Sequence, residues 1–370
     1  MKILQINKLY PPTIGGVESV VRDIAEGLNK KTETDVLVCR KKGKAQTEVY
    51  GGVRLTRAAS LGVLMSMPVS PDFLLKYRKM SQKADIISIH HPFPLADLAL
   101  WLFGVKKKLV IWWHSDIVRQ KFMLKLLSPL IRHSLNKADL IIVATEEMIS
   151  SSAFLPKHTA KCAVIPYGLD FDVYENPRGE NFLTDKLFSA DSKKLLFAGR
   201  LVYYKGIDIL LKAMAGIEGA ELFVAGDGKL RDELIGQAGA LGMREKIHFL
   251  GKLSDGDLRR AYSDCDIFVF PSCENSEAFG ISQLEAMFYG KPVINTNLPT
   301  GVPTVSIDGV TGITVPPKDV SALREAIIKL LENDTLRKEY GKNAAKRVRE
   351  HFDLKQMLSK LLSHYHGLFK

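Results

Sequence analysis

Two carboxylates, Glu277 and Glu285, stand eight positions apart and enclose a Phe-Gly pair. An apolar run and a polar loop precede them, and a helix-like run follows, so the pattern predicts strand, loop, glycine and helix. Backbone N–H groups of Phe279, Gly280 and Ile281 would then lie at a helix N-terminus, where a phosphate is favoured. Glu277 would lie before the helix and Glu285 more than a turn inside it, at about 1.5 Å of rise per residue. The two acids are therefore expected to bind opposite ends of an extended ligand that carries a phosphate.

A guanidinium and an ammonium group, those of Arg200 and Lys205, stand five positions apart at the end of another apolar run. Gly199 lies before the arginine and Gly206 follows the lysine. Arginine offers a fork of N–H donors and lysine a compact charge, so the pair is suited to hold a diphosphate. We refer to Arg200 and Lys205 as the diphosphate clamp.

The N-terminal half holds a weaker set of candidates. Gly15 and Gly16 lie between a predicted strand and a predicted helix, where backbone approaches a ligand phosphate closely, although a plain turn has the same composition. His114 ends an apolar run and is expected either to meet a ligand or to be a buried structural histidine. Arg119 and Lys121 open a basic, apolar stretch that fits either a lipid diphosphate or a solvated helix face.

Composition narrows the class of protein. With 370 residues, 46% of them hydrophobic and 25% charged, the chain is typical of a globular protein and suits two domains. Its four cysteines show no metal-binding spacing and are typical of a reducing compartment. No run of about 18 apolar residues is present, so no membrane span is expected. The strand-like N-terminus does not resemble a signal peptide.

The positive charge is confined to one half of the chain. Residues 1–170 hold 25 Lys and Arg against 14 Asp and Glu, a net charge of +11, whereas residues 171–370 hold 27 of each sign. A basic half beside a neutral one indicates an anionic partner for the basic half. Nucleic acid, an anionic membrane surface and a lipid diphosphate all fit this charge.

Short apolar runs alternate with longer helix-like runs along the chain, which predicts an α/β fold with parallel sheets. The expected domains are residues 1–170 and 193–352, with a polar linker over 171–192 and a final amphipathic helix over 353–370. Expected strands cover residues 3–6, 36–39, 86–89, 109–113, 140–143, 163–165, 195–198, 221–225, 247–249, 267–270 and 292–295. Expected helices cover residues 17–29, 72–82, 95–103, 121–135, 146–152, 206–214, 229–241, 255–262, 280–289, 320–331, 336–351 and 354–368.

The motifs occur together in an order that is known from one family. A Pro-Ser loop precedes Glu277, Gly290-Lys-Pro292 follows Glu285, and the Gly-Arg…Lys-Gly motif of residues 199–206 lies upstream. With these motifs the chain resembles the retaining, GT-B-fold glycosyltransferases of family 4 (group 1), and the resemblance spans nearly the whole chain. It implies two doubly wound, Rossmann-like domains that face a central cleft, with the last helix crossing back to the N-terminal domain.

The resemblance also implies roles for the candidate residues. Glu277 would contact the hydroxyls of a donor sugar, Glu285 would hold the ribose of the nucleotide, and His114 would lie near the sugar 6-position. Arg200 and Lys205 would bind the diphosphate and stabilise the charge that develops as it departs. His114, Arg200, Lys205 and Glu277 form the expected catalytic set. No side chain is an evident nucleophile. The resemblance implies a reaction on one face of the sugar, in which the leaving phosphate helps to deprotonate the acceptor.

Further donor contacts are implied by the same resemblance. The expected donor-binding residues, besides the clamp and Glu285, are Gly15, Gly16, Phe279, Gly280, Ile281, Gly251 and Leu253. Metal-dependent glycosyltransferases use a D-x-D motif, and two such triplets occur, at residues 170–172 and 264–266. Neither triplet lies where the resembling family binds the diphosphate, and the clamp already supplies positive charge. We therefore expect neither a metal ion nor another cofactor.

The N-terminal half narrows the resemblance to bacterial mannosyltransferases of O-antigen and related polysaccharides. The similarity rests on four motifs, which are His91-Pro-Phe-Pro94 with Asp97, His114-Ser-Asp-Ile-Val-Arg-Gln-Lys121, Ile165-Pro-Tyr-Gly-Leu169 and Ser276-Glu-Ala-Phe-Gly-Ile281. It implies transfer of mannose from GDP-mannose to a polyprenyl-diphosphate-linked glycan acceptor. A UDP-hexose remains the main alternative donor.

The acceptor domain implied by the fold is the basic, N-terminal one. The run of residues 119–137 combines apolar and basic side chains as an interfacial helix does, although Pro129 could bend it. We expect a cytoplasmic protein that is held peripherally at the anionic inner face of the cytoplasmic membrane. The expected acceptor and membrane contacts are Asp116, Arg119, Lys121 and Lys125.

A different class of function is a non-catalytic, basic protein that binds nucleic acid or a glycan. Such a protein would explain the charge of the first half but not the paired acids Glu277 and Glu285. The second half has no net charge, so it offers no second basic surface to contact a nucleic acid. We therefore expect no nucleic-acid partner.

Overall fold

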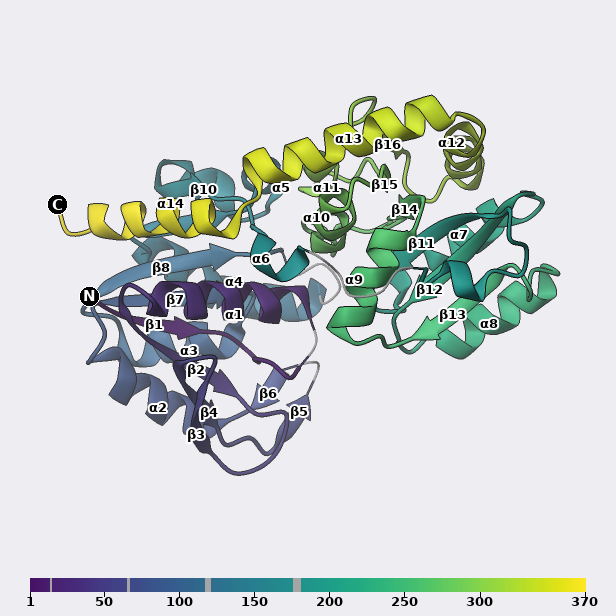
Figure 1. Cartoon of the computed structure of the whole chain (residues 1–370). Coiled ribbons are helices and arrows are strands. Elements are labelled where there is room, and N and C mark those ends of the chain that lie inside the picture. Colours follow the sequence, from purple (N-terminus) through teal and green to yellow (C-terminus); the bar gives the residue numbers. More distant parts are fainter. Residues whose placement is uncertain (14, 65–66, 117–120, 176–180) are drawn as a thin grey trace. The chain divides into compact units, whose positions relative to one another are not determined.

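The computed structural model describes residues 1–13, 15–64, 67–116, 121–175 and 181–370, with residues 121–123 described by their backbone alone. The chain forms two compact units, each with its own sheet (Figure 1). Unit 1 comprises Met1–Gly168 and Leu354–Lys370, and unit 2 comprises Leu169–Asp353.

Unit 1 is built on an eight-stranded sheet with the order β10-β9-β8-β7-β1-β2-β4-β3. Neighbouring strands are parallel except β3 and β4, which pair antiparallel at the edge. Strands β7 and β9 are buried at every position, as expected where helices cover both faces of a parallel sheet. The strands are β1 (Lys2–Ile6), β2 (Glu33–Cys39), β3 (Gln46–Tyr50), β4 (Val53–Ala58), β7 (Ile86–His91), β8 (Lys108–Trp113), β9 (Leu140–Val143) and β10 (Cys162–Val164).

Local sequence explains the helices that connect these strands. Helix α2 begins where the Ser70 hydroxyl accepts from the Phe73 N–H at 3.2 Å and Pro71 occupies the first helical position. The helices are α1 (Gly16–Asn29), α2 (Pro71–Ser81), α3 (Pro94–Phe103), α4 (Lys121–Lys137), α5 (Glu147–Ser151), η1 (Leu155–Lys161) and α14 (Leu354–Gly367). A separate two-stranded hairpin, β5 (Gly62–Leu64) and β6 (Met67–Val69), follows β4.

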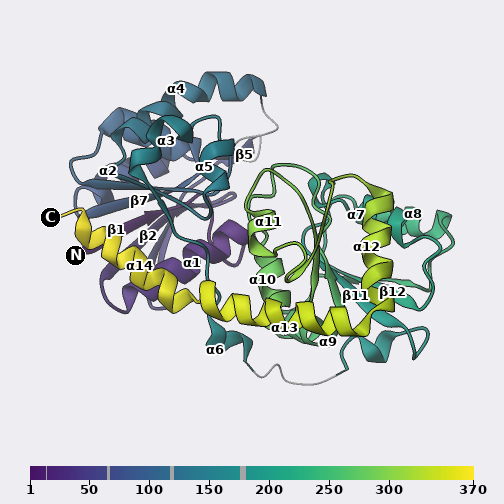
Figure 2. The same cartoon turned by 90° about the horizontal axis from the view of Figure 1, so that it is seen from above.

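The last helix, α14, belongs to unit 1, which confirms the predicted return of the chain to the N-terminal domain. It packs beside α1 (Figure 2). A Cβ built on Gly27 of α1 would lie 2.3 Å from a methyl carbon of Leu358, so the glycine permits this close approach. Farther along α14, the buried Tyr365 hydroxyl lies 3.3 Å from the Ser88 hydroxyl of β7.

Unit 2 is built on a six-stranded, fully parallel sheet with the order β13-β12-β11-β14-β15-β16. Its strands are β11 (Lys193–Ala198), β12 (Ala220–Ala225), β13 (Ile247–Gly251), β14 (Ile267–Val269), β15 (Val293–Thr296) and β16 (Gly312–Val315). Its helices are α6 (Phe171–Tyr174), η2 (Thr184–Lys186), η3 (Tyr203–Lys205), α7 (Ile207–Met214), α8 (Arg231–Ala240), α9 (Asp255–Asp264), α10 (Ile281–Phe288), α11 (Val302–Val305), α12 (Val320–Glu332) and α13 (Asp334–His351).

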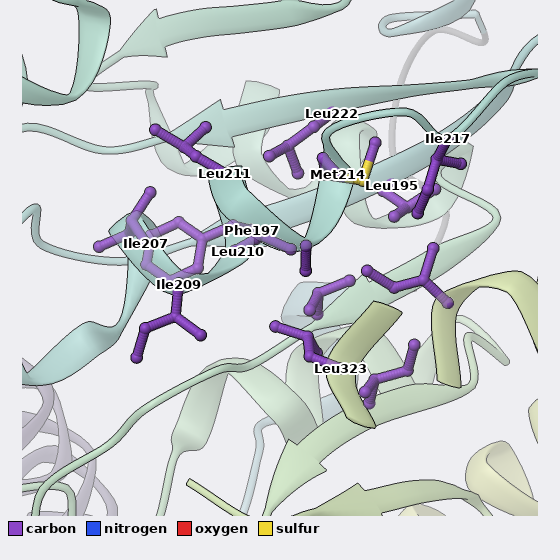
Figure 3. Close-up of a cluster of buried hydrophobic side chains, with 14 of the residues drawn as sticks. Leu195, Phe197, Ile207, Ile209, Leu210, Leu211, Met214, Ile217, Leu222 and Leu323 are labelled. Carbon is purple, nitrogen blue, oxygen red and sulfur yellow. The ribbon is translucent and has the colours of Figure 1, made fainter. Parts of the chain in front are cut away.

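Apolar side chains from strands and helices fill the space between the sheet and the helices of unit 2. Phe197 of β11 and Leu222 of β12 lie on the sheet, and Leu210 of α7 and Leu323 of α12 pack against them (Figure 3). These side chains are 2% exposed or less. At about 25 cal/mol for each Å² of apolar surface removed from water, such burial is the main stabilising contribution to the unit.

The described residues of the expected linker, 171–175 and 181–192, belong to unit 2. Both oxygens of the Asp264 carboxylate accept hydrogen bonds from this segment. One accepts from the backbone N–H groups of Leu183 and Thr184 at 2.6 and 2.9 Å, and the other accepts from the Thr184 hydroxyl. Lys194 donates to the same carboxylate at 2.8 Å. These bonds fix η2 to the sheet, which polar composition alone did not indicate.

Candidate functional site

The candidate site of unit 2 begins where β11 and β14 lie side by side although β12 and β13 intervene in sequence. The chain leaves these two strands toward opposite sides of the sheet, and ligands of doubly wound folds bind at the carboxyl end of such a switch point. Gly206, after β11, has φ +66°, and a Cβ built on it would lie 2.1 Å from the Pro271 carbonyl oxygen after β14. The two loops therefore touch, and the contact requires a glycine.

This contact brings together two residues that the sequence placed far apart. The Lys205 ammonium lies 2.5 Å from a carboxylate oxygen of Glu277, and the two side chains are 10% and 12% exposed. The Ser272 hydroxyl donates to the same oxygen at 3.0 Å. The ammonium also lies 4.7 Å from the centre of the Phe270 ring, which favours a cation. Lys205 and Glu277 are thus a nearly buried charge pair at the switch point.

The second residue of the clamp, Arg200, is exposed and lies in the same loop. One of its terminal nitrogens donates to the Tyr204 hydroxyl at 2.9 Å. The loop after β12 packs closely against the residue before Arg200, because a Cβ on Gly226 would lie 1.8 Å from the Gly199 carbonyl oxygen. Gly226 also donates its N–H to the Gly251 carbonyl at 2.8 Å. The segment of the predicted donor-binding residues Gly251 and Leu253, the latter half-buried, therefore adjoins the loop that carries the clamp.

The N-terminus of α10 lies in the same part of unit 2. Its N-cap, Gly280, has φ +84° and, among the described residues, no side-chain cap, as is usual where a helix N-terminus is left to bind another group. A Cβ on Gly280 would lie 2.8 Å from the Phe270 ring. Phe279 is buried and Ile281 is half-buried. As predicted, glycine and helix follow the strand. The binding of an anion at this helix N-terminus stays a prediction.

Glu285, the acid inside α10, is held by two tyrosines that sequence reasoning did not identify. The Tyr174 hydroxyl donates to one carboxylate oxygen at 2.6 Å, and the Tyr262 hydroxyl donates to the other at 2.7 Å. Burial and the neighbouring carboxylate raise the pKa of Tyr262 well above its ordinary value, so this donor stays protonated. The carboxylate is therefore oriented by the protein, with further lone pairs able to accept from ribose hydroxyls.

Gly15 and Gly16 lie where they were expected in unit 1. Helix α1 begins at Gly16, directly after the loop that follows β1. Strands β1 and β7 are neighbours in the sheet, so this loop lies at the switch point of unit 1. A Cβ on Gly15 would lie 2.0 Å from a carboxylate oxygen of Glu18, so the glycine makes room for that side chain.

His114 is the inner member of a buried chain of hydrogen bonds. Its Nδ1 lies 2.5 Å from the Tyr167 hydroxyl, and its Nε2 lies 2.8 Å from Nδ1 of His90. Nε2 of His90 lies 2.9 Å from Oε1 of Gln5, an acceptor, so His90 donates there and accepts from His114. Tyr167 then donates to His114. Both ring nitrogens of His114 are engaged within unit 1, and the imidazole is 3% exposed.

Burial lowers the pKa of His114 to about 3, and burial with the neighbouring imidazoles lowers that of His90 well below its ordinary value. The unfolded chain therefore takes up protons near pH 6.5 that the folded chain takes up only at much lower pH. Stability should be complete above pH 6.5 and fall as the pH drops below it, by about 1.4 kcal/mol per pH unit for each imidazole.

Urea unfolding at pH 7.5, 6.5 and 5.5 measures this loss. His114→Gln should flatten the dependence, whereas the exposed His351→Gln should leave it unchanged. An unfolding free energy of the wild-type chain that does not fall between pH 6.5 and 5.5 would contradict the assignment of neutral, buried histidines.

Comparison with known proteins identifies the family. Residues 14–173 match the family described as "Glycosyltransferase Family 4", and residues 180–347 match "Glycosyl transferases group 1". The D-rhamnosyltransferase WbpZ of Pseudomonas aeruginosa is 36% identical over 356 residues, which cover 95% of this chain and 92% of that protein. The chain belongs to the family 4 (group 1) glycosyltransferases. The O-antigen chain mannosyltransferase C of Escherichia coli is 31% identical over 382 residues, covering 100% and 99% of the two chains.

Solved structures confirm the GT-B fold of this glycosyltransferase. The sucrose-phosphate synthase of Thermosynechococcus elongatus superposes with a TM-score of 0.84 at 22% identity and covers 100% of this chain and 99% of its own. Anabaena Alr3699/HepE, solved in complex with UDP, gives a TM-score of 0.82 at 21% identity, covering 99% and 100%. The predicted α/β class with two doubly wound units is confirmed.

The two acids of one D-x-D triplet, Asp264 and Asp266, serve the fold of the glycosyltransferase. Asp264 holds the segment around η2, as described above, and Asp266 accepts from the Lys194 N–H at 2.7 Å and so joins β14 to β11. Within the described ranges, no three His, Cys, Asp or Glu side chains gather as a metal-binding group. The absence of a metal requirement remains a prediction.

Two of the predicted acceptor residues, Asp116 and Lys125, are placed in unit 1, and their acceptor role stays a prediction. Asp116 accepts from the Trp113 indole at 2.9 Å, the Ser152 hydroxyl at 2.7 Å and the Ala153 N–H at 2.8 Å, so its carboxylate joins β8 to the segment after α5. Lys125 is exposed on α4, which continues through Pro129. Arg119 lies outside the described residues, as does the side chain of Lys121. Every helix that the structure describes is too short or too polar to cross a membrane.

Proposed function

We propose that this glycosyltransferase moves mannose from GDP-mannose to a polyprenyl-diphosphate-linked glycan, with retention of the anomeric configuration, in bacterial surface polysaccharide synthesis. The observation that carries the proposal is the Lys205–Glu277 pair at 2.5 Å, beside a glycine-capped helix N-terminus and at the switch point of unit 2. A cation, a sugar-binding acid and a helix N-terminus then meet where a nucleotide sugar would bind.

Each group has a separate task in this proposal. The diphosphate lies against the first turn of α10 and draws the Lys205 ammonium from Glu277, with Arg200 closing the exposed side. Glu277, released from its partner, accepts from hydroxyls of the sugar. Glu285, oriented by its two tyrosines, accepts from the ribose. The oxygen of the acceptor hydroxyl bonds to the anomeric carbon as the bond between that carbon and the phosphate oxygen breaks. The cations stabilise the departing charge, and a phosphate oxygen takes the proton of the acceptor hydroxyl.

Two relatives support a sugar of the manno configuration. Their names describe transfer of D-rhamnose in one case and of mannose in the other. D-Rhamnose is 6-deoxymannose, so these sugars differ only at carbon 6. GDP-D-rhamnose is therefore the second candidate donor, favoured by the 36% identity with the rhamnosyltransferase.

The donor assignment is tested by thermal shift with GDP, UDP, ADP and their sugars. GDP and GDP-mannose should stabilise the wild-type chain selectively. Glu285→Ala should lose most of this stabilisation, about 2 kcal/mol of binding energy, because two charge-assisted hydrogen bonds to the ribose disappear. Glu274→Ala removes an acid that pairs with Lys318 at 2.6 Å at the surface of the preceding loop, and it should bind as the wild type does. Selective stabilisation by UDP sugars would overturn the GDP assignment.

The acceptor and location form part of the same proposal. The net charge of +11 on residues 1–170 matches an anionic acceptor diphosphate and an anionic leaflet, and each basic residue near such a leaflet contributes about 1 kcal/mol. We place the protein in the cytoplasm, peripherally attached at the inner face of the cytoplasmic membrane. One relative is named for O-antigen chain synthesis, which supports a lipid-linked glycan as acceptor.

A further inference from the structure

The β5–β6 hairpin exposes apolar side chains on both of its faces. Successive residues of a strand point to opposite sides, yet Val63 and Leu64 are 50% and 66% exposed. Leu61, just before β5, is 73% exposed, and Val69 at the end of β6 is 40% exposed. Pro68, which pairs with Val63, is buried, but neither face of the hairpin is buried throughout. An apolar cluster exposed in this way marks an interaction site.

A basic loop is fastened to the base of this hairpin. Gly43 and Ser60 exchange two backbone hydrogen bonds, each of 2.9 Å, and the Ser60 hydroxyl donates to the Gly62 carbonyl at 2.9 Å. The loop carries four cations, which are Arg40, Lys41, Lys42 and Lys44. The three lysines are exposed, and none of the four cations lies within ion-pair distance of a carboxylate in the part of the chain that the structure describes.

The surface formed by this loop and the hairpin is uniformly basic and apolar. The segments 40–46 and 59–71 contain no Asp or Glu. Exposed lysines around an apolar cluster match a bilayer with anionic headgroups, since the apolar chains enter the acyl boundary while the ammonium groups stay among the phosphates. We propose that the hairpin and the basic loop dock unit 1 on the surface of an anionic bilayer. This inference rests on the proposed function, in which the acceptor is a membrane lipid.

The position of this surface in the sheet fits that task. The basic loop follows the carboxyl end of β2, and the hairpin follows the carboxyl end of β4, which is parallel to β2. The same edge carries the glycine loop after β1 and His114 after β8. In Figure 1, β5 and β6 lie at the end of unit 1 toward which the arrow of β8 points. Docking by this edge would present a lipid-linked glycan to the acceptor side of unit 1.

A second exposed apolar patch supplies a matched control. Trp101 and Leu102, at the end of α3, are 58% and 48% exposed, and Lys106 and Lys107 follow them. Because α3 returns from the carboxyl edge to the amino edge of the sheet, this patch lies at the opposite edge. It is as apolar as the hairpin and also has lysines beside it, but it lies away from the glycine loop.

The test is sedimentation of the full chain with two kinds of vesicle. One consists of phosphatidylcholine alone, and in the other about 30% of the lipid is phosphatidylglycerol, which makes the surface anionic. Leu61→Ser with Leu64→Ser should reduce partition onto the anionic vesicles at least about tenfold. Lys41→Ala, Lys42→Ala and Lys44→Ala together should reduce it about a hundredfold. Two control variants should partition as the wild type does. The apolar control is Trp101→Ser with Leu102→Ser. The basic control combines Lys79→Ala, Lys106→Ala and Lys107→Ala.

Unchanged binding of the hairpin variants, an equal loss in the control variants, or no binding of the wild-type chain to anionic vesicles would each overturn the docking surface. The proposed function is scored separately, by stabilisation with GDP-mannose in the same preparations. Hairpin variants that keep this stabilisation but lose the vesicles support the inference. Absence of any stabilisation by GDP-mannose would contradict the proposed donor but would not affect the vesicle result.

Discussion

Replacement of Lys205 by alanine is expected to slow sugar transfer about a hundredfold to a thousandfold, the loss seen when one group that stabilises transition-state charge is removed. The ammonium is nearly buried and lies 2.5 Å from Glu277, in a setting where water screens its charge poorly. Its effect should fall mainly on kcat, because the charge on the diphosphate grows as the bond to the sugar breaks. Steady-state kinetics of nucleotide release measures this.

The matched control for Lys205 is Lys318→Ala, which removes a lysine that is 60% exposed and pairs with Glu274. It should leave kcat within a factor of about two, as surface ion pairs contribute little. Circular dichroism must show that Lys205→Ala is folded, because Glu277 loses its cation. A folded Lys205→Ala variant with wild-type kcat would show that the clamp does not act on the leaving group.

Replacement of Gly206 by alanine is expected to lower the free energy of unfolding by about 3 to 5 kcal/mol. Two costs add, since a left-handed conformation costs a non-glycine residue about 1–2 kcal/mol and the added Cβ would lie 2.1 Å from the Pro271 carbonyl oxygen. That oxygen belongs to backbone, so the loops after β11 and β14 must separate to relieve the contact. Urea unfolding at fixed pH measures the loss.

Gly216 is the control for the contact between the added Cβ of Gly206→Ala and the Pro271 carbonyl oxygen. Its φ of +81° is also left-handed, but a Cβ on it would have no neighbour within 4 Å among the described residues. Gly216→Ala should therefore show the conformational cost alone, about 1–2 kcal/mol. Equal losses for the two variants would mean that the loops do not press on each other at the switch point.

Much of the fold follows from local sequence. Most of the strands and helices, the switch-point loops and the helix after Gly280 were predicted, because apolar runs and glycines at strand ends act over a few residues. The β3–β4 hairpin was missed although Gly51 and Gly52 signal it: both have positive φ, as a two-residue hairpin turn requires. Strand β3 is mostly exposed, so it lacks the apolar run that indicated the other strands.

Side-chain pairing was less predictable than the elements. Local sequence gave no reason to pair Lys205 with Glu277, which lie 72 positions apart, or to set Tyr174 and Tyr262 on Glu285. These contacts arise when β11, β14 and the helices pack, and no local pattern encodes that. His114 illustrates the same point, since its partner His90 lies in a different strand, β7. Its contact with the donor sugar stays a prediction, and the structure gives it a neutral, positioned imidazole.

The most direct test of the account is proton NMR of purified protein incubated with GDP-mannose, with water as the acceptor. The account predicts release of GDP and mannose, with the α anomer of mannose appearing first because the donor is α-linked and the configuration is retained. Lys205→Ala should release neither at a comparable rate. First appearance of the β anomer, or cleavage of a UDP-hexose while GDP-mannose stays intact, would contradict it.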